Sequence, residues 1–288
     1  MLYMHVTPQR VRNESGFTQE MSSVVEPEHE KDSAQRLHTF IMNDDVLAVE
    51  RFLKSGVDVH GLYENRTPLH TAAGGGNWLD HPLRATHSPQ IPMKITRLLI
   101  DFKADVNRGV SKGWFSGKTP LHFAAEYRPA GVIKLLIEEG ADVAAADCWG
   151  EIPLLSAYGL RRRDGMWDVD RLIRAGSDVN AAKMDGTTVL AIAVSHTRVG
   201  MVELLLRSGA TPSLSVTDWQ GLTPLERARV IKKWHSVEHK AALIETGRLE
   251  KKSDRGGDSD DFCPSTALVE SSEICDMLQR AEEKRLIH

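Results

Sequence analysis

The chain has 288 residues, a formal net charge of −4 and 41% hydrophobic residues, a composition typical of a globular protein. This charge balance gives no general attraction to nucleic acid or to an anionic membrane, so neither is expected as a partner. The sequence has no apolar run approaching the roughly eighteen residues of a membrane span, and its first residues lack the apolar core of a secretory signal.

The three cysteines, Cys148, Cys263 and Cys275, are far apart and odd in number. They form neither a disulfide framework nor a zinc-binding spacing, which favours a reducing compartment. We therefore expect an intracellular protein, cytoplasmic or nuclear. The common nucleotide-binding, metalloprotease and serine-hydrolase motifs do not occur, so no cofactor and no metal ion is expected.

In chain order, residues 1–32 are polar and lack apolar periodicity, so we expect them to be disordered. An internal repeat begins near residue 33. The tetrapeptide Thr67-Pro68-Leu69-His70 recurs at Thr119, and weaker copies begin at Ile152, Thr188 and Thr223. A second motif, an apolar stretch followed in most copies by a glycine, recurs in register with the first. Its equivalent positions are Gly56, Lys103, Gly140, Gly176 and Gly209.

Each copy predicts two helices. Thr-Pro is a typical helix start, with Thr as the N-cap and Pro at the first helical position. The second helix carries an apolar stripe and ends at a glycine suited to the left-handed C′ position. A single pair cannot bury its apolar face, whereas a stack of pairs can. We expect six units, near residues 33–63, 64–108, 116–146, 149–181, 185–214 and 220–246.

In these residues the chain resembles the ankyrin-repeat family. The resemblance covers about three quarters of the sequence and implies an all-α repeat solenoid, in which helix–turn–helix units carry β-hairpin-like fingers. Lys103 replaces the usual glycine, and the fourth and fifth units lack the motif histidine. Glu226 stands at the histidine position of the sixth unit, as suits a terminal repeat.

The second unit carries an insertion at residues 74–92. Thr67 and Lys103 are 36 residues apart, whereas Thr119 and Gly140 are 21 apart, so 15 extra residues separate the two helices. Its three glycines are expected to end a helix and not to form a nucleotide loop. The next finger, residues 108–118, is also lengthened, and both insertions are expected to form a wall beside the groove.

Three histidines, His38, His70 and His122, share one repeat position and could suggest a metal site. Equivalent side chains of stacked units lie roughly 10 Å apart, about one helix spacing, which metal–nitrogen bonds of about 2 Å cannot bridge. The resemblance implies instead that these imidazoles are structural and hydrogen-bond to the backbone of the neighbouring finger.

The resemblance also implies a partner-binding surface, formed by residues just before each Thr-Pro motif and just after each Ala-Ala pair. Because aromatic side chains are favoured at binding hot spots, Trp78 in the insertion and Trp114 in the long finger are added to it. The candidates are Tyr63, Arg66, Trp78, Trp114, Phe115, Lys118, Glu126, Tyr127, Trp149, Glu151, Met184, Asp185, His196 and Trp219.

The favoured function is a non-catalytic adapter, expected to be monomeric, that binds a protein or peptide in the concave groove and at the finger tips. An alternative is a small-molecule-binding or enzymatic protein, in which Asp80, His81, His87, Glu126 and Tyr127 form an acid–base pocket. A third possibility is a nuclear co-regulator of transcription that acts through a bound factor.

Residues 247–263 are polar and are expected to form a linker. In residues 264–288, Ile274, Met277, Leu278 and Ala281 share one helical face. This C-terminal helix could cap the stack or dock onto a partner, and capping is favoured.

Overall fold

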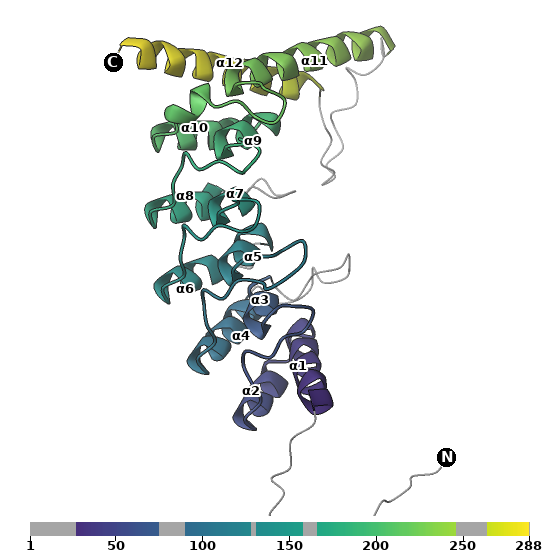
Figure 1. Ribbon diagram of the computed structural model, residues 1–288. Coiled ribbons are helices and arrows are strands. Elements are labelled where there is room, and N and C mark those ends of the chain that lie inside the picture. The colour runs from purple at the N-terminus through teal and green to yellow at the C-terminus, as the bar shows by residue number, and fades with distance from the viewer. Residues whose placement is uncertain (1–26, 75–89, 128–130, 158–165, 246–263, 288) are drawn as a thin grey trace, which may run out of the picture.

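The computed structural model describes residues 27–74, 90–127, 131–157, 166–245 and 264–287. In these residues the chain forms an elongated stack of helix pairs (Figure 1). The α-helices are α1 (Pro27–Met42), α2 (Val46–Lys54), α3 (Pro68–Ala73), α4 (Gln90–Asp101), α5 (Pro120–Tyr127), α6 (Val132–Glu138), α7 (Pro153–Ser156), α8 (Met166–Arg174), α9 (Val189–Ser195), α10 (Val199–Arg207), α11 (Pro224–Glu245) and α12 (Pro264–Ile287), and a short 3-10 helix covers Pro212–Ser215. The expected all-α repeat solenoid is confirmed.

The first helix of each inner unit starts where the sequence pattern predicts. Pro68 and Pro153 occupy the first turns of α3 and α7, directly after a residue in extended conformation. At α9, the hydroxyl oxygen of Thr188 accepts a hydrogen bond from the N–H of Ala191 over 3.2 Å. Thr188 thereby satisfies a backbone donor that would otherwise lack a partner at the beginning of a helix, and a proline at the first helical position has no such donor.

The second helices end at left-handed residues, as predicted. Gly56, Gly140, Gly176 and Gly209 have φ values between 84° and 97°. Lys103 occupies the equivalent position with φ 70°, a conformation that is unfavourable for a residue with a side chain. The second unit therefore has a different cap residue but keeps the cap conformation.

The core follows the repeat. The motif leucines Leu69, Leu121, Leu154 and Leu190 are each fully buried. The alanines that follow two of them, such as Ala124 and Ala125, are also buried and allow neighbouring first helices to approach closely. Each unit thus buries its apolar face mainly against the units on either side, which is the physical basis of a solenoid.

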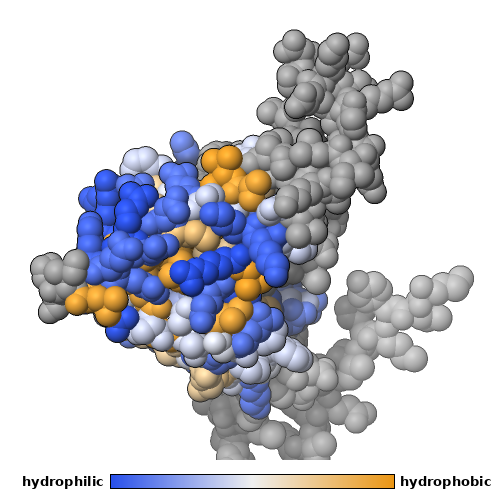
Figure 2. Space-filling model, turned by 90° about the horizontal axis from the view of Figure 1, so that it is seen from above, coloured by the Kyte–Doolittle hydropathy of each residue, from blue (hydrophilic) through white to orange (hydrophobic). Residues whose placement is uncertain are grey.

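The C-terminal end departs from the expected sixth unit. Residues 224–245 form one continuous helix, α11, where a shorter helix pair had been expected. α12 packs against α11 and α10, and its Ile274 and Leu278 are buried in the main core. The ring of His235 on α11 lies 3.1 Å from the carbonyl oxygen of Ala267 on α12. Figure 2 views this end of the stack, where hydrophobic patches are scattered among hydrophilic side chains.

Two helices begin earlier in the structure than the sequence predicts. α1 begins at Pro27, so residues 27–32 are helical and not disordered as expected. The physical reason is that Glu and Lys are good helix formers, and a helix can extend over them without an apolar stripe. α4 likewise starts at Gln90, inside the expected insertion of residues 74–92. The expectations for residues 1–26, 75–89 and 247–263 lie outside the described residues.

Candidate partner-binding groove

The fingers that connect the helix pairs are narrow turns joined to one another through their backbones. We number each finger by the unit that follows it. The N–H of Asp147 donates to the carbonyl of Glu151 over 3.0 Å and closes the fourth finger, which precedes α7. Between fingers, the N–H of Cys148 donates to the carbonyl of Ser116 over 3.0 Å. The N–H of Met184 likewise donates to the carbonyl of Trp149 over 2.9 Å. The three fingers that contain Ser116, Cys148 and Met184 therefore form a backbone ladder beside the first helices.

Two of the motif histidines fix this ladder to the helices. The Nδ1 atom of His70 accepts the N–H of Thr67 over 3.1 Å, so the ring proton is on Nε2, which donates to the carbonyl of Lys118 over 3.1 Å. His122 repeats the arrangement, with its Nε2 lying 2.8 Å from the carbonyl oxygen of Glu151. At both positions the threonine hydroxyl contacts the imidazole.

These imidazoles are buried and uncharged. Burial is the largest cause that lowers the pKa of His70 to about 3, and burial likewise lowers the pKa of His122. His38 differs in its partner, because Gln35 stands where the units of His70 and His122 have threonine. The Nδ1 atom of His38 lies 2.7 Å from the hydroxyl oxygen of Thr71. The three histidines act as connectors between units, and among the described residues no group of side chains is arranged to hold a metal ion.

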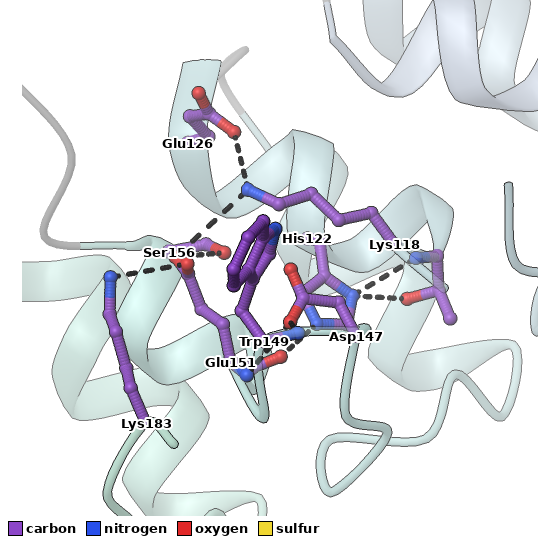
Figure 3. Close-up of polar contacts among 9 residues, drawn as sticks. Lys118, His122, Glu126, Asp147, Trp149, Glu151, Ser156 and Lys183 are labelled. Carbon is purple, nitrogen blue, oxygen red and sulfur yellow. Dashed lines mark hydrogen bonds and ion pairs between the residues drawn. The ribbon is translucent and has the colours of Figure 1, made fainter. Parts of the chain in front are cut away.

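A network of charged side chains lies beside the ladder (Figure 3). The ammonium group of Lys118 is 3.1 Å from Glu126 and 4.0 Å from Glu151, and that of Lys183 is 3.2 Å from Glu151. The hydroxyl of Ser156 donates to Glu151 over 2.9 Å. Burial alone would raise the pKa of Glu151, but the two lysines outweigh it and the pKa is lowered. This carboxylate therefore stays charged and ties three units together.

The finger tips are held in place by buried aspartates. Asp147 accepts the N–H groups of Trp149 and Glu151 over 2.8 and 2.9 Å. In the sixth finger, Asp218 accepts the N–H groups of Gln220 and Leu222, and its second carboxylate oxygen accepts a hydrogen bond from the guanidinium of Arg227 over 2.7 Å. Such turns fix the backbone of the residues they enclose, so the tips present their side chains at defined positions.

Between the fingers and the first helices lies an open groove of about 440 Å³. Six of the predicted binding residues line it, namely Lys118, Glu126, Glu151, Asp185, His196 and Trp219. Ser156, Lys183, Thr187, Leu155 and Ile192 complete the lining and were not predicted. For Lys183 a signal was present, because it lies in the finger one unit after Glu151 and has the opposite charge.

Large apolar side chains are exposed at the tips of four successive fingers. The exposed fractions are 83% for Trp114, 52% for Trp149, 77% for Met184 and 69% for Trp219. Tyr127, at the end of α5, is 38% exposed. Exposed aromatic and methionine side chains on a fixed backbone are typical of recognition surfaces.

Three other predicted residues lie nearer the N-terminal end and take part in packing. Phe115 is half-buried, with its ring centre 5.9 Å from that of Phe123, and the guanidinium of Arg66 lies 5.0 Å from the Phe115 ring centre. The ring centre of Tyr63 is 5.5 Å from that of His38. None of the three lines the groove, and Trp78 lies outside the described residues.

The residues proposed for an acid–base pocket are only partly described. Asp80, His81 and His87 lie outside the described residues. Glu126 is paired with Lys118, and burial, with the nearby Glu126, raises the pKa of Tyr127 to about 12. A tyrosine with so high a pKa keeps its proton at neutral pH and is a poor general base.

The fold and the groove define a helical repeat protein whose fingers and first helices present one continuous surface. The family model for the ankyrin repeat matches residues 116–148, which run from the end of the long finger through α5 and α6 into the next finger. Residues 116–148 therefore form an ankyrin repeat, and the helix pairs before and after them follow the same pattern. The described residues contain no helix that is both long and apolar enough to cross a membrane.

Similar proteins match over part of this chain. The Neurogenic locus Notch protein of Drosophila melanogaster is 32% identical over 158 residues, which is 54% of this chain and 6% of that protein. The Neurogenic locus notch homolog protein 1 of Xenopus tropicalis is 33% identical over 46% of this chain, and that of Homo sapiens is 32% identical over the same share. In both, the match covers 5% of the relative, so the chain spans only a small part of the length of these proteins.

Proposed function

We propose that this chain is a non-catalytic interaction module that binds a protein or peptide along the groove and the finger tips. Ankyrin repeats are generally protein-interaction modules, which supports the class of function but not a particular partner. The observation that carries the proposal is the row of exposed Trp149, Met184 and Trp219 beside the groove that Trp219 also lines.

The arrangement is suited to binding because few loops and side chains have to lose conformational freedom when a partner binds. The histidine connectors, the buried aspartates and the Glu151 network hold the groove in one conformation before a partner arrives. Ordering of loops and side chains at an interface costs about 0.5–1.5 kcal/mol for each immobilised side chain, so a preformed surface binds more tightly. Insertion 74–92 and finger 108–118 are proposed to tune specificity, since loops on a rigid scaffold commonly carry it.

The proposal can be tested with a random peptide library. Wild-type protein alone would be used for selection, and the selected peptides would then be titrated against wild type and against the double variant W149A/W219A. Trp167→Ala is the matched control, because Trp167 is 79% exposed but lies on α8, outside the groove lining. We expect the selected peptides to bind wild type and W167A equally and to bind the double variant at least about twentyfold more weakly.

The circular dichroism and the unfolding midpoint of each variant would show that all three proteins are folded. Peptides that bind the double variant as tightly as wild type would place the binding surface elsewhere and contradict the proposal. A deletion of residues 75–89 tests the second part: altered peptide preference with an unchanged unfolding midpoint supports a specificity role, and unchanged preference rules it out.

A further inference from the structure

The charged side chains that line the groove do not cancel one another. The lining contains five of them, namely Lys118, Glu126, Glu151, Lys183 and Asp185. The two lysines pair with the two glutamates over 3.1 to 4.0 Å (Figure 3). His196, which also lines the groove, is uncharged at neutral pH because burial, with the nearby Arg198, lowers its pKa. Two positive and three negative side chains leave one negative charge in excess, and it belongs to Asp185.

Asp185 lies in the fifth finger and is held in place by a turn. One of its carboxylate oxygens accepts the N–H of Thr187 over 2.8 Å, and the residue is exposed. Among the described residues Asp185 takes part in no ion pair, in contrast to Glu126 and Glu151. An oxygen of this carboxylate is therefore available to a ligand that enters the groove.

Trp219 of the sixth finger is presented next to Asp185. Asp185 occupies in the fifth finger the position that Trp149 occupies in the fourth, directly before a glycine. Trp219 likewise occupies in the sixth finger the position of Met184 in the fifth. In the fourth and fifth fingers these two positions are joined, because the N–H of Met184 donates to the carbonyl of Trp149 over 2.9 Å. The repeat therefore places Trp219 beside Asp185, and both line the same groove.

A close contact between the fifth and sixth fingers supports this placement. Gly186 follows Asp185 and has a φ of 82°, and a Cβ added to it would lie 2.7 Å from the carbonyl oxygen of Thr217. Thr217 stands two residues before Trp219, so the two finger backbones touch within two residues of both side chains. Trp219 is 69% exposed, so much of its indole ring is accessible from the groove.

An exposed indole beside an unpaired carboxylate is suited to a guanidinium group. The guanidinium of arginine is planar, stacks on aromatic faces and can donate two parallel hydrogen bonds to one carboxylate. A lysine ammonium group is compact and strongly hydrated, so it gains less from the same two side chains. A carboxylate of the ligand would be repelled by Asp185, and an apolar side chain could use only the indole of Trp219.

We propose that the groove binds an arginine side chain of the peptide ligand, with its guanidinium stacked on Trp219 and hydrogen-bonded to Asp185. This inference rests on the proposed peptide-binding function and adds the identity of one ligand residue. The arginine also neutralises the excess negative charge of the lining, while Lys118 and Lys183 remain paired with their glutamates.

The test uses peptides selected from the random library with wild-type protein. We expect an arginine in the peptides that bind most tightly. One such peptide is synthesised with its arginine, and with lysine or citrulline in its place, since citrulline keeps the planar shape of arginine but is uncharged. Titration calorimetry against the full chain should show binding about fivefold weaker with citrulline, and an intermediate affinity with lysine.

Asp185→Asn then tests the proposed contact. Asparagine keeps an oxygen that can accept the N–H of Thr187, so the turn is retained while the charge is lost. This variant should bind the arginine peptide about fivefold more weakly than wild type, and its affinity for the citrulline peptide should change less than about twofold. Trp219→Leu, which keeps an apolar side chain but removes the ring, should weaken binding of the arginine peptide about threefold.

The matched control is Asp178→Asn. Asp178 is also exposed and accepts the N–H of Asn180 over 2.9 Å, but it lies outside the groove lining. The substitution removes the same charge from a similar turn, so this variant should bind both peptides as wild type does.

Selected peptides that lack arginine, or that bind Asp185→Asn as tightly as wild type, would overturn the inference. If those peptides still bind W149A/W219A more weakly, the proposed function stands. A preference for aspartate or glutamate that is lost in Lys183→Ala would show that the lysines recognise an anion, and would overturn the inference in the same way. If no peptide binds, or none depends on Trp149 and Trp219, the inference and the proposed function both fail.

Discussion

His70 on α3 donates from Nε2 to the backbone carbonyl of Lys118 in the next finger, over 3.1 Å. The side chain of the same Lys118 pairs with Glu126 and reaches Glu151 in the groove. A buried residue of the second unit thereby sets the position of a charged residue that lines the candidate binding groove. Stability and recognition are physically connected at this point.

Replacing His70 by alanine should destabilise the protein by about 3 kcal/mol. The change removes hydrogen bonds to Thr67 and Lys118 and leaves a cavity in a fully buried site. Urea unfolding followed by circular dichroism measures the loss. The control is His196→Ala, which changes an exposed histidine and should leave the unfolding midpoint nearly unchanged. Equal midpoints for the two variants would show that His70 is not a connector.

Stability should fall when the pH is lowered from 7 to 5. In the folded chain, burial lowers the pKa of His70 to about 3 and that of His38 to about 4, whereas the unfolded value is near 6.5. Below pH 6.5 the unfolded chain therefore binds protons that the folded chain does not, and folding becomes less favourable. At pH 5 each histidine should contribute a loss of about 2 kcal/mol. The free energy of unfolding measured at several pH values checks this.

The variant H70Q isolates one of these contributions. Its unfolding free energy should depend less steeply on pH between 6.5 and 4 than that of wild type, by up to about 1.4 kcal/mol per pH unit. An unchanged slope would mean that His70 is protonated in the folded protein, contrary to its burial.

Replacing Lys103 by glycine should stabilise the protein by about 0.5–1 kcal/mol. Lys103 is held at φ 70°, a left-handed conformation that glycine adopts without steric cost. Gly140→Ala is the inverse control: it has φ 84° and free space around an added Cβ, so the change should destabilise through the backbone alone. A shift of the urea midpoint in the same direction for both variants would contradict this explanation.

Truncating Leu278 to alanine should destabilise the stack by about 2–5 kcal/mol, which would support the proposed capping role of α12. Leu278 is fully buried in the main core together with residues of α9 and α10. Val269→Ala, on the same helix but 64% exposed, should change the unfolding free energy by less than about 0.5 kcal/mol. If Leu278→Ala leaves the unfolding of the stack unaltered, α12 is not part of its core.

The repeat, its helix starts and its cap glycines could be predicted from the sequence because they depend on local chemistry. Thr-Pro starts a helix, glycine favours the left-handed cap, and a three- to four-residue apolar spacing marks the buried face. Since each unit contacts mainly its neighbours, recognising one unit is nearly enough to predict the stack. The connector role of His70 and His122 was likewise expected, through the resemblance to the ankyrin family.

The tertiary structure decided which of the candidate side chains meet. Phe115 and Trp114 are adjacent in one finger, yet Phe115 packs against Phe123 while Trp114 is exposed. Ser156 and Lys183 converge on Glu151 from different units, and α12 packs beside the single long helix α11. These outcomes depend on which side chains come into contact when the units fold and stack. Sequence periodicity does not indicate which of two neighbouring side chains turns toward such a contact.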